Sequence, residues 1–409
     1  MEKIKEEFEE IEKQELPDSF CWAPYVNLDL DQDGSFYPCY RSKERQGKWK
    51  DSNVVEEYNN ESMQTLRDDL WNGRENPNCV QCHRREAEGL ESTRQQYNKH
   101  FVETIANDLD MVDDIIENHK IADISKIHTM EIRPHGMCTN ACAHCDENSS
   151  SRWIKIQGLT DQFNNNFIDD PDLLTEFFDQ NDHLKTVHFT GGEPLLYEKT
   201  HLQYLNKLPK NIELRYHTSL KTLPGEEILE AWAQFDHVKV FVSLDTSEKF
   251  FAYFRWGSNW PTVTENIAVI KDIVEVRAAI TVNVLTMLDF IPLISYLVDN
   301  QIPINVAFVD PPHQLSCVFL PTHLKLFGAR SIDQALVKVR EYKEDWMVKQ
   351  AQERIESIRT FMFSHYNGGV WHPETIRLFE ALDQVYGLQI RNLTPELSKV
   401  RARNDLSAL

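Results

Sequence analysis

The chain has 409 residues, enough for two or three domains with a substantial core, and its apolar content of 41% is ordinary for a globular protein. It has no run of about 18 apolar residues, and its acidic first 18 residues are unlike a secretory signal, so we expect a cytoplasmic protein without a membrane span. A formal net charge of −22 argues against a general nucleic-acid-binding protein, which would carry a basic surface.

Residues 1–98 are predicted to form an exposed N-terminal helix, over residues 1–16, followed by a small cysteine-bearing module. The alternation from Tyr25 to Leu30 and the turn-forming residues Asp31–Gly34 predict a hairpin, which brings the flanking Cys21 and Cys39 together. A helix over Met63–Trp71 leads to a CxxC pair, Cys79 and Cys82. From the spacing alone, these four thiols suit either structural zinc or a fully ligated iron–sulfur cluster.

The next segment, residues 99–127, continues a charged helical region and is predicted to connect the module to the core. Residues 128–312 alternate strand and helix patterns, which implies a parallel sheet with right-handed crossovers, in an open sheet or a partial barrel. The predicted strands are Thr129–Arg133, Thr186–Thr190, Ile212–His217, Val238–Leu244, Ala279–Leu285 and Ile304–Val309. The intervening predicted helices include Gly225–Phe235, Val263–Val276 and Ile291–Asn300.

Residues 313–409 are predicted to form a helical cap. No strand pattern occurs from residue 321 onward, and the helix candidates are Ser331–Lys343, Asp345–Phe363, Pro373–Tyr386 and Pro395–Ala402.

Three closely spaced cysteines, Cys138, Cys142 and Cys145, follow the first core strand in a CxxxCxxC pattern. A loop of this length can wrap three corners of an iron–sulfur cube and leaves the fourth iron without a protein ligand. An open iron is a site for chemistry. The loop lies at the carboxyl end of a strand, where α/β folds keep their active sites.

Together with the sequence FTGGEPLL at the end of the second core strand, this loop resembles the radical S-adenosylmethionine (SAM) superfamily, over residues 128–310. The resemblance implies a partial (β/α)6 barrel and a [4Fe–4S] cluster held by Cys138, Cys142 and Cys145. It also implies SAM bound to the open iron and its reductive cleavage to a 5′-deoxyadenosyl radical that takes hydrogen from a substrate.

The resemblance assigns SAM-binding roles to two further stretches. Gly191 and Gly192 permit close backbone approach, and Glu193 accepts the SAM amino group. In VSLDTSEKFFAYFRW, the resemblance places Ser243, Asp245 and Arg255 near SAM, with Arg255 pairing its carboxylate. The alternative for Ser243 and Asp245 is that they cap the next helix. The alternative for Arg255 is a surface ion pair.

One position departs from the usual motif. The residue before the third cysteine is commonly aromatic and covers the adenine, whereas here it is His144. A neutral imidazole is flat and can stack in the same way; the alternative is a residue of the loop surface.

The N-terminal module, with its sequences CWAPY, DGSFYPCY and CVQC, resembles the twitch and SPASM modules that accompany many radical SAM enzymes. This resemblance implies an auxiliary [4Fe–4S] cluster on Cys21, Cys39, Cys79 and Cys82. Its position before the core departs from the best-known members, where the module follows the barrel.

These resemblances imply a radical SAM enzyme that acts on a peptide or protein with a flavodoxin- or ferredoxin-type electron donor. A small-molecule substrate is one alternative, and a non-enzymatic zinc or cluster scaffold is another. Cys317 is interpreted as a small buried apolar residue rather than a catalytic thiol, and His217 as packing or pocket lining rather than an acid or base.

Overall fold

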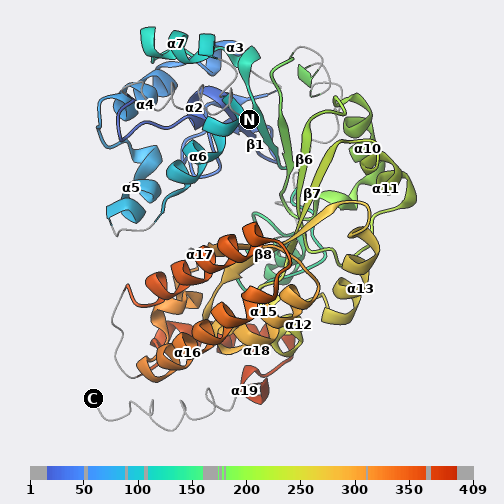
Figure 1. The fold of residues 1–409 in the computed structure, drawn as a ribbon. Helices are drawn as coiled ribbons and strands as arrows, with labels where there is room; N and C mark the ends of the chain where they lie inside the picture. The colour runs from blue at the N-terminus through green and yellow to red at the C-terminus, as the bar shows by residue number, and fades with distance from the viewer. Residues whose placement is uncertain are drawn as a thin grey trace. The chain divides into compact units, whose positions relative to one another are not determined.

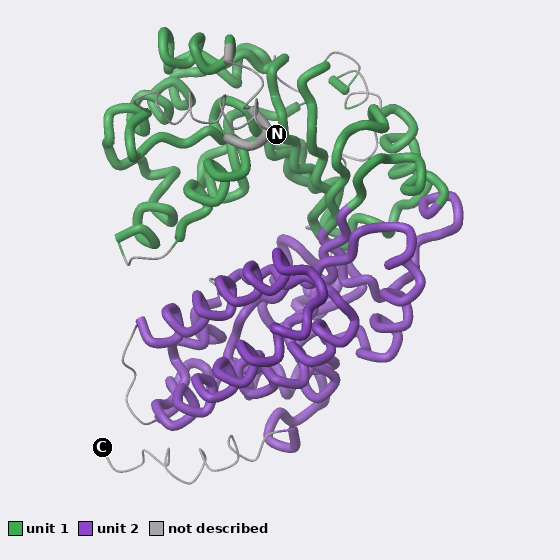
Figure 2. The backbone as a smooth tube through the Cα atoms, viewed as in Figure 1, with its two compact units in different colours: residues 1–136, 164–216, 230–238 green, residues 137–163, 217–229, 239–409 purple. Residues whose placement is uncertain are grey.

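The computed structural model describes residues 16–49, 54–87, 91–105, 109–159, 174, 177–178, 181–309, 312–364 and 370–393 (Figure 1). They belong to two compact units, each assembled from several stretches of chain (Figure 2). The first unit draws on residues 1–136, 164–216 and 230–238, and the second on residues 137–163, 217–229 and 239–409. The helices predicted for residues 1–16 and Pro395–Ala402 fall on residues outside the described ranges, apart from residue 16.

The first unit is organised around a sheet with the strand order β3-β2-β1-β4-β5-β6. The predicted hairpin is present: β1 (Asn27–Leu30) pairs antiparallel with β2 (Ser35–Tyr37), which pairs antiparallel with β3 (Gly47–Lys48). On its other side β1 pairs in parallel with β4 (Thr129–Ile132). The N-terminal hairpin therefore extends the same sheet as the strand that precedes the three-cysteine loop.

The sheet of this unit continues in parallel through two further strands, β5 (Thr186–Phe189) and β6 (Glu213–Thr218). The remaining elements of this unit are helices and one-turn helices. They are α2 (Ala23–Val26), α3 (Val54–Glu57), α4 (Glu61–Trp71), α5 (Val80–Ala87), α6 (Thr93–Ile105), α7 (Leu109–Glu117) and α10 (Glu198–Lys207), with one-turn helices at Pro77–Cys79, Ile124–Lys126 and Pro194–Leu196.

A fully buried guanidinium joins several of these N-terminal segments. Arg67 of α4 donates two hydrogen bonds to the carbonyl of Pro24, at 2.9 and 3.0 Å. It also donates to the carbonyls of Tyr58 and Lys120, at 2.8 and 3.0 Å. Because Pro24 lies in α2, three residues after Cys21, Arg67 helps to place this cysteine.

The second unit contains a parallel three-strand set in the order β7-β8-β9, with most of β7 included. The strands are β7 (His237–Ser243), β8 (Glu275–Val282) and β9 (Ile304–Phe308). Its helices are α8 (Ser151–Gln157), α12 (Glu248–Phe254), α13 (Trp260–Ile270), α14 (Val284–Leu288), α15 (Phe290–Asp299), α16 (Thr322–Lys338), α17 (Asp345–Met362), α18 (Pro373–Tyr386) and α19 (Ile390–Leu393). The chain also forms α11 (Glu226–Trp232), which has residues in both units.

All six predicted core strands are confirmed, and so is the α/β fold class with parallel strands and a helical C-terminal region. Several boundaries were wrong. The helix predicted over Ser331–Lys343 spans Thr322–Lys338 instead. The helix predicted over Val263–Val276 ends at Ile270, and β8 begins at Glu275, where alternate residues become buried. At the other end Asn283 stops the strand, because its side chain accepts the N–H groups of Leu285 and Thr286 and caps α14.

Within the described residues no helix is long and apolar enough to cross a membrane.

Candidate active site

The three-cysteine loop of the second unit is anchored along its backbone. The N–H groups of Ala141 and Ala143 donate to the carbonyls of Trp256 and Phe254, both at 2.8 Å. The indole of Trp153 donates to the carbonyl of Cys142, at 3.1 Å. Thus the residues between the cysteines hold the loop in place, which leaves the thiols available as ligands.

Two side chains of the adjoining segment reach the central cysteine. Arg255 directs a guanidinium nitrogen to Cys142 Sγ at 3.7 Å and donates through Nε to Asp245 Oδ2 at 2.6 Å. The other oxygen of Asp245 accepts the backbone N–H of Thr281, at 2.7 Å. The carboxylate therefore orients the guanidinium, and the guanidinium stabilises negative charge on the sulfur.

The donor set fits an iron–sulfur cluster. The N–H of Asn140 donates to Cys138 Sγ at 3.4 Å, as amides do towards ligating thiolates. Burial and repulsion from Cys142 and Cys138 raise the pKa of Cys145 well above its usual range. A positively charged iron centre would relieve that repulsion, so the chemistry of these three thiols suits a bound cluster.

The structure places each of the predicted SAM-contacting residues of this unit at the same end of the parallel strands. Ser243 is the last residue of β7, and Asp245 follows it. His144 stacks on Phe254, with ring centroids 5.0 Å apart and an interplanar angle of 11°. Burial and the nearby Arg255 lower the pKa of His144 to about 4, so the imidazole is neutral near pH 7. Contact of these residues with SAM stays a prediction.

The GGE loop belongs to the first unit. Gly191 has φ of +104°, and a Cβ there would lie 2.8 Å from the carbonyl oxygen of His135, so this backbone requires glycine. The N–H of Gly192 donates to the same carbonyl, at 3.1 Å. Glu193 follows at the start of a one-turn helix and is 7% exposed. The loop is thus held close against the segment that follows β4.

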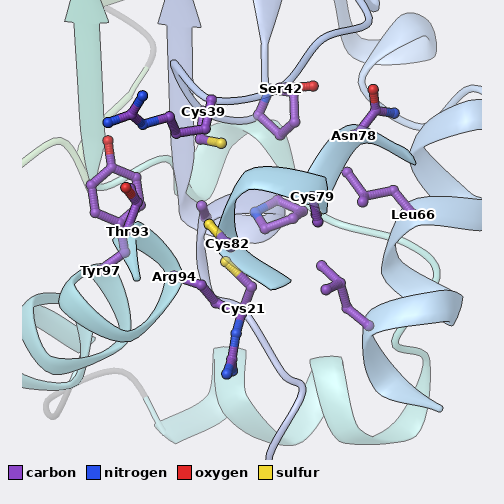
Figure 3. A pocket seen from close by; sticks show the side chains of 15 residues that line it. Cys21, Cys39, Ser42, Leu66, Asn78, Cys79, Cys82, Thr93, Arg94 and Tyr97 are labelled. Atoms are coloured by element: carbon purple, nitrogen blue, oxygen red, sulfur yellow. The ribbon is translucent and has the colours of Figure 1, made fainter. Parts of the chain in front are cut away.

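The four N-terminal cysteines line one cavity, as predicted from the hairpin and the CxxC pair (Figure 3). Cys21 precedes α2, Cys39 follows β2, Cys79 ends a one-turn helix and Cys82 lies in α5. Figure 3 shows Thr93, Arg94 and Tyr97 of α6 along the same cavity. Among the described residues, no three His, Cys, Asp or Glu side chains are gathered tightly enough to hold a single metal ion.

The surroundings of these cysteines also suit a cluster. Burial raises the pKa of the Cys39 thiol to about 12 and, with repulsion from neighbouring thiolates, raises the pKa values of Cys21 and Cys79 further. The backbone of Arg41 and Ser42 opposes this rise in the pKa of Cys39. Four thiol ligands around one cavity, with backbone groups that favour a thiolate, fit a [4Fe–4S] cluster that has no vacant iron.

Sequence reasoning missed Arg94, which joins two of the cysteine-bearing segments. Its guanidinium donates to the carbonyls of Asp18 and Phe20, at 2.6 and 2.7 Å, just before Cys21. It also forms a two-point ion pair with Glu86 of α5, at 3.0 and 2.8 Å, one turn after Cys82. The arginine occupies an ordinary helical position, so no local pattern could reveal it.

Comparison with known proteins identifies one domain of the chain. Residues 132–294 match the model of the radical SAM superfamily, and no curated protein gives a significant match. This range contains the CxxxCxxC and GGE motifs. Residues 132–294 therefore form a radical SAM domain.

Solved structures show a distant likeness in fold. Streptococcus suis SuiB bound to S-adenosylmethionine is 17% identical, with a TM-score of 0.40, and the match covers 62% of this chain and 58% of SuiB. SuiB bound to its precursor peptide SuiA is 15% identical, with a TM-score of 0.40 and coverage of 63% and 58%. The structure of anSMEcpe with bound AdoMet is 16% identical, with a TM-score of 0.39 and coverage of 51% and 61%. The chain thus spans less than two thirds of the length of each.

Proposed function

We propose that this protein cleaves SAM reductively at a [4Fe–4S] cluster on Cys138, Cys142 and Cys145 and uses the resulting radical chemistry on a peptide or protein substrate. A bound cluster with SAM on its open iron supplies one-electron cleavage of the sulfonium to a 5′-deoxyadenosyl radical, which abstracts hydrogen. The observation that carries the proposal is the anchored three-thiol loop, with the guanidinium of Arg255 on Cys142 inside a radical SAM domain.

The protein's own groups have distinct tasks in this proposal. Asp245 holds Arg255 beside Cys142, where the guanidinium stabilises thiolate charge and remains a donor for a carboxylate ligand. Gly191 and Gly192 give the SAM methionine group close access to the backbone, and Glu193 accepts its amino group. His144, neutral and stacked on Phe254, offers a flat surface for adenine.

We further propose that Cys21, Cys39, Cys79 and Cys82 hold an auxiliary [4Fe–4S] cluster in a twitch- or SPASM-like module. The backbone groups that oppose the rise in the pKa of Cys39 and the shared cavity support a cluster. Such modules most often accompany peptide-modifying enzymes, and this is the support for a peptide or protein substrate. A flavodoxin- or ferredoxin-type protein is the proposed electron donor.

Anaerobic reconstitution tests the activity. Wild-type protein is expected to bind iron and sulfide and to form 5′-deoxyadenosine from SAM with dithionite. Simultaneous replacement of Cys138, Cys142 and Cys145 by Ala should abolish this product. Cys317→Ala is the matched control, because Cys317 is fully buried in the same unit and has no assigned ligand role.

The outcomes separate the alternatives. Product formation by the triple variant would refute the assignment of the three-cysteine loop. A colourless protein that binds zinc and yields no 5′-deoxyadenosine would support the scaffold alternative. For the substrate, failure of the active enzyme to bind any peptide encoded beside its gene would favour a small molecule.

A further inference from the structure

One face of the sheet in the first unit is polar across four strands. Parallel strands are usually apolar on both faces, because helices cover them. Here the residues alternate: Leu28, Met130, Val187 and Leu214 form one apolar row, whereas the next residue on each strand is Asp29, Glu131, His188 and Arg215. The alternation therefore places a polar row on the second face, although β1 and β4 are buried on both faces.

The polar residues form a single row. Strand register places Asp29 beside Glu131, Glu131 beside His188, and His188 beside Arg215. Residues paired across adjacent strands point to the same face and lie about 5 Å apart. The four side chains, which we call the ionic row, therefore run directly across β1, β4, β5 and β6.

The carboxylate at one end of the ionic row lacks a hydrogen-bond donor. Asp29 is 1% exposed, and neither of its side-chain oxygens receives a hydrogen bond from the described residues. Arg133 contacts it at 3.6 Å, beyond hydrogen-bond distance, and also contacts Glu131 at 3.3 Å. A buried carboxylate without a donor is costly because it has lost its hydration, and burial together with the charge of Glu131 raises the pKa of Asp29 well above its usual range.

The acidic side chains in and around the ionic row outnumber its cationic side chains. Glu131 Oε1 accepts the hydroxyl of Thr190 at 3.1 Å, and Oε2 lies 3.6 Å from the ring of His188. Burial and the charges of Arg215 and Arg133 lower the pKa of His188 to about 3, so it adds no positive charge. Arg215 already pairs with Glu213, and Arg133 is shared among three carboxylates: Asp29, Glu131 and Asp31. Four acids therefore face two guanidinium groups.

The ionic row adjoins both the GGE loop and the cysteine cavity of this unit. Thr190, which bonds to Glu131, directly precedes Gly191, and a Cβ on Gly191 would lie 3.5 Å from the Cα of Arg133. At the other side, Tyr97 lines the cysteine cavity, and the charge of Glu131 contributes to the raised pKa of Tyr97. The side chains of Glu131 and His188 are 11% and 16% exposed, so the middle of the row can be reached.

We propose that the ionic row is the substrate-binding surface of this enzyme and that it selects a substrate bearing a cationic group, an ammonium or guanidinium such as a Lys or Arg side chain. This inference rests on the proposed peptide substrate. The cation binds to Glu131 beside His188. It adds positive charge to Asp29 and Glu131, which both contact Arg133. The reacting part of the substrate then lies next to the GGE loop.

Peptide pools test the selection on anaerobically reconstituted, full-length protein. The pools are capped pentapeptides with uncharged mixed flanking residues, a neutral fluorophore and a central Lys, norleucine or Glu, and binding is read by fluorescence anisotropy. Wild type should bind the Lys pool at least about tenfold more tightly than the norleucine pool, the value of one charge-assisted hydrogen bond. In Glu131→Gln and Asp29→Asn this preference should fall below about threefold.

Glu353→Gln, at an exposed position of α17, is the matched control and should keep the full preference. Equal binding of the Lys and norleucine pools by wild type would overturn the proposal, and this comparison needs no variant that folds. A preference that survives both row variants would also overturn it. Formation of 5′-deoxyadenosine is measured on the same wild-type preparation; its absence would refute the proposed radical SAM activity, while the anisotropy would still decide the cation preference.

Discussion

Replacement of Arg94 by methionine is expected to remove the auxiliary cluster without affecting the three-cysteine loop. Methionine fills similar space but donates no hydrogen bond. The change frees the segment before Cys21 from α6 and separates it from α5, which carries Cys82, because Arg94 contacts both.

The expected loss of stability follows from the individual contacts. The carbonyl of Asp18 loses its donor, at about 1–3 kcal/mol, reduced by its position near the surface. The carbonyl of Phe20 keeps the hydrogen bond from Asn98, at 2.8 Å, so its loss is about 0.5–1 kcal/mol. The side chain of Glu86 is 22% exposed and regains water when its ion pair with Arg94 is removed, so this contact contributes only about 1 kcal/mol to the loss of stability. The free energy of unfolding should therefore fall by about 2–4 kcal/mol.

The assay isolates the auxiliary site. In a background with Cys138, Cys142 and Cys145 replaced by Ala, the N-terminal cysteines are the ligands left for a [4Fe–4S] cluster, so iron content reports on them. Iron should fall from about four atoms per chain to near zero in Arg94→Met. Urea unfolding measures the stability change, and Arg94→Lys, which keeps the charge but not the two-point geometry, should be intermediate.

The control is Arg359→Met on α17. Arg359 also contacts two acids, Asp333 and Glu356, at 2.6 and 3.0 Å, but these acids are exposed, so stability should change by less than about 1 kcal/mol. If Arg94→Met retained its iron and unfolded at the same urea concentration as Arg359→Met, the proposed role of Arg94 would be wrong.

Three further predictions concern the other parts of the site. Gly191→Ala should weaken SAM binding, measured by calorimetry, by more than about tenfold, because the added Cβ would meet a backbone carbonyl. Gly158→Ala is the control, since Gly158 also has a positive φ but open space around it, and it should leave SAM binding unchanged. Equal effects of the two variants would contradict this reasoning. Arg255→Met should destabilise the apo-protein by about 3–5 kcal/mol in urea unfolding, because it leaves the buried Asp245 without its ion-pair partner. Adding Asp245→Asn should recover part of that loss. If the two substitutions had additive effects on stability, the ion pair between Arg255 and Asp245 would not be supported. Burial lowers the pKa of His201 to about 3, below its ordinary 6.5. The neutral imidazole therefore stabilises the fold above pH 6.5, and this contribution is lost towards pH 3 by about 1.4 kcal/mol per pH unit. His201→Gln should lose less stability than wild type between pH 7 and pH 5, and parallel losses in the two proteins would refute the assignment.

The sequence was sufficient for features that depend on short-range pattern. The six core strands were predictable because alternating or continuous apolar residues end at turn-forming residues. The proximity of the cysteines within each motif also follows from the sequence, since CxxxCxxC and CxxC confine their thiols to short loops; their role as ligands stays a prediction. Likewise, the positive φ of Gly191 follows the glycine pair of the GGE motif.

Boundaries failed where a helical pattern runs into a strand. Residues 271–276 continue the apolar spacing of α13, yet the chain turns after Ile270 because β8 pairs with β7 from Glu275 and with β9 from Ala278. Strand pairing is a tertiary interaction, and it overrides local propensity.

Only the tertiary structure revealed the contacts between distant segments. The pairing of β1 with β4 aligns Asp29 with Glu131, and the packing of α6 brings Arg94 to both Cys-bearing segments. Neither contact leaves a sequence signal, because each partner occupies an ordinary position in its own strand or helix. Periodicity determines which face of an element a residue occupies, whereas strand register and packing determine which residue lies opposite. Short-range sequence pattern was therefore enough to find the proposed cysteine ligands, whereas the ionic row required the tertiary structure.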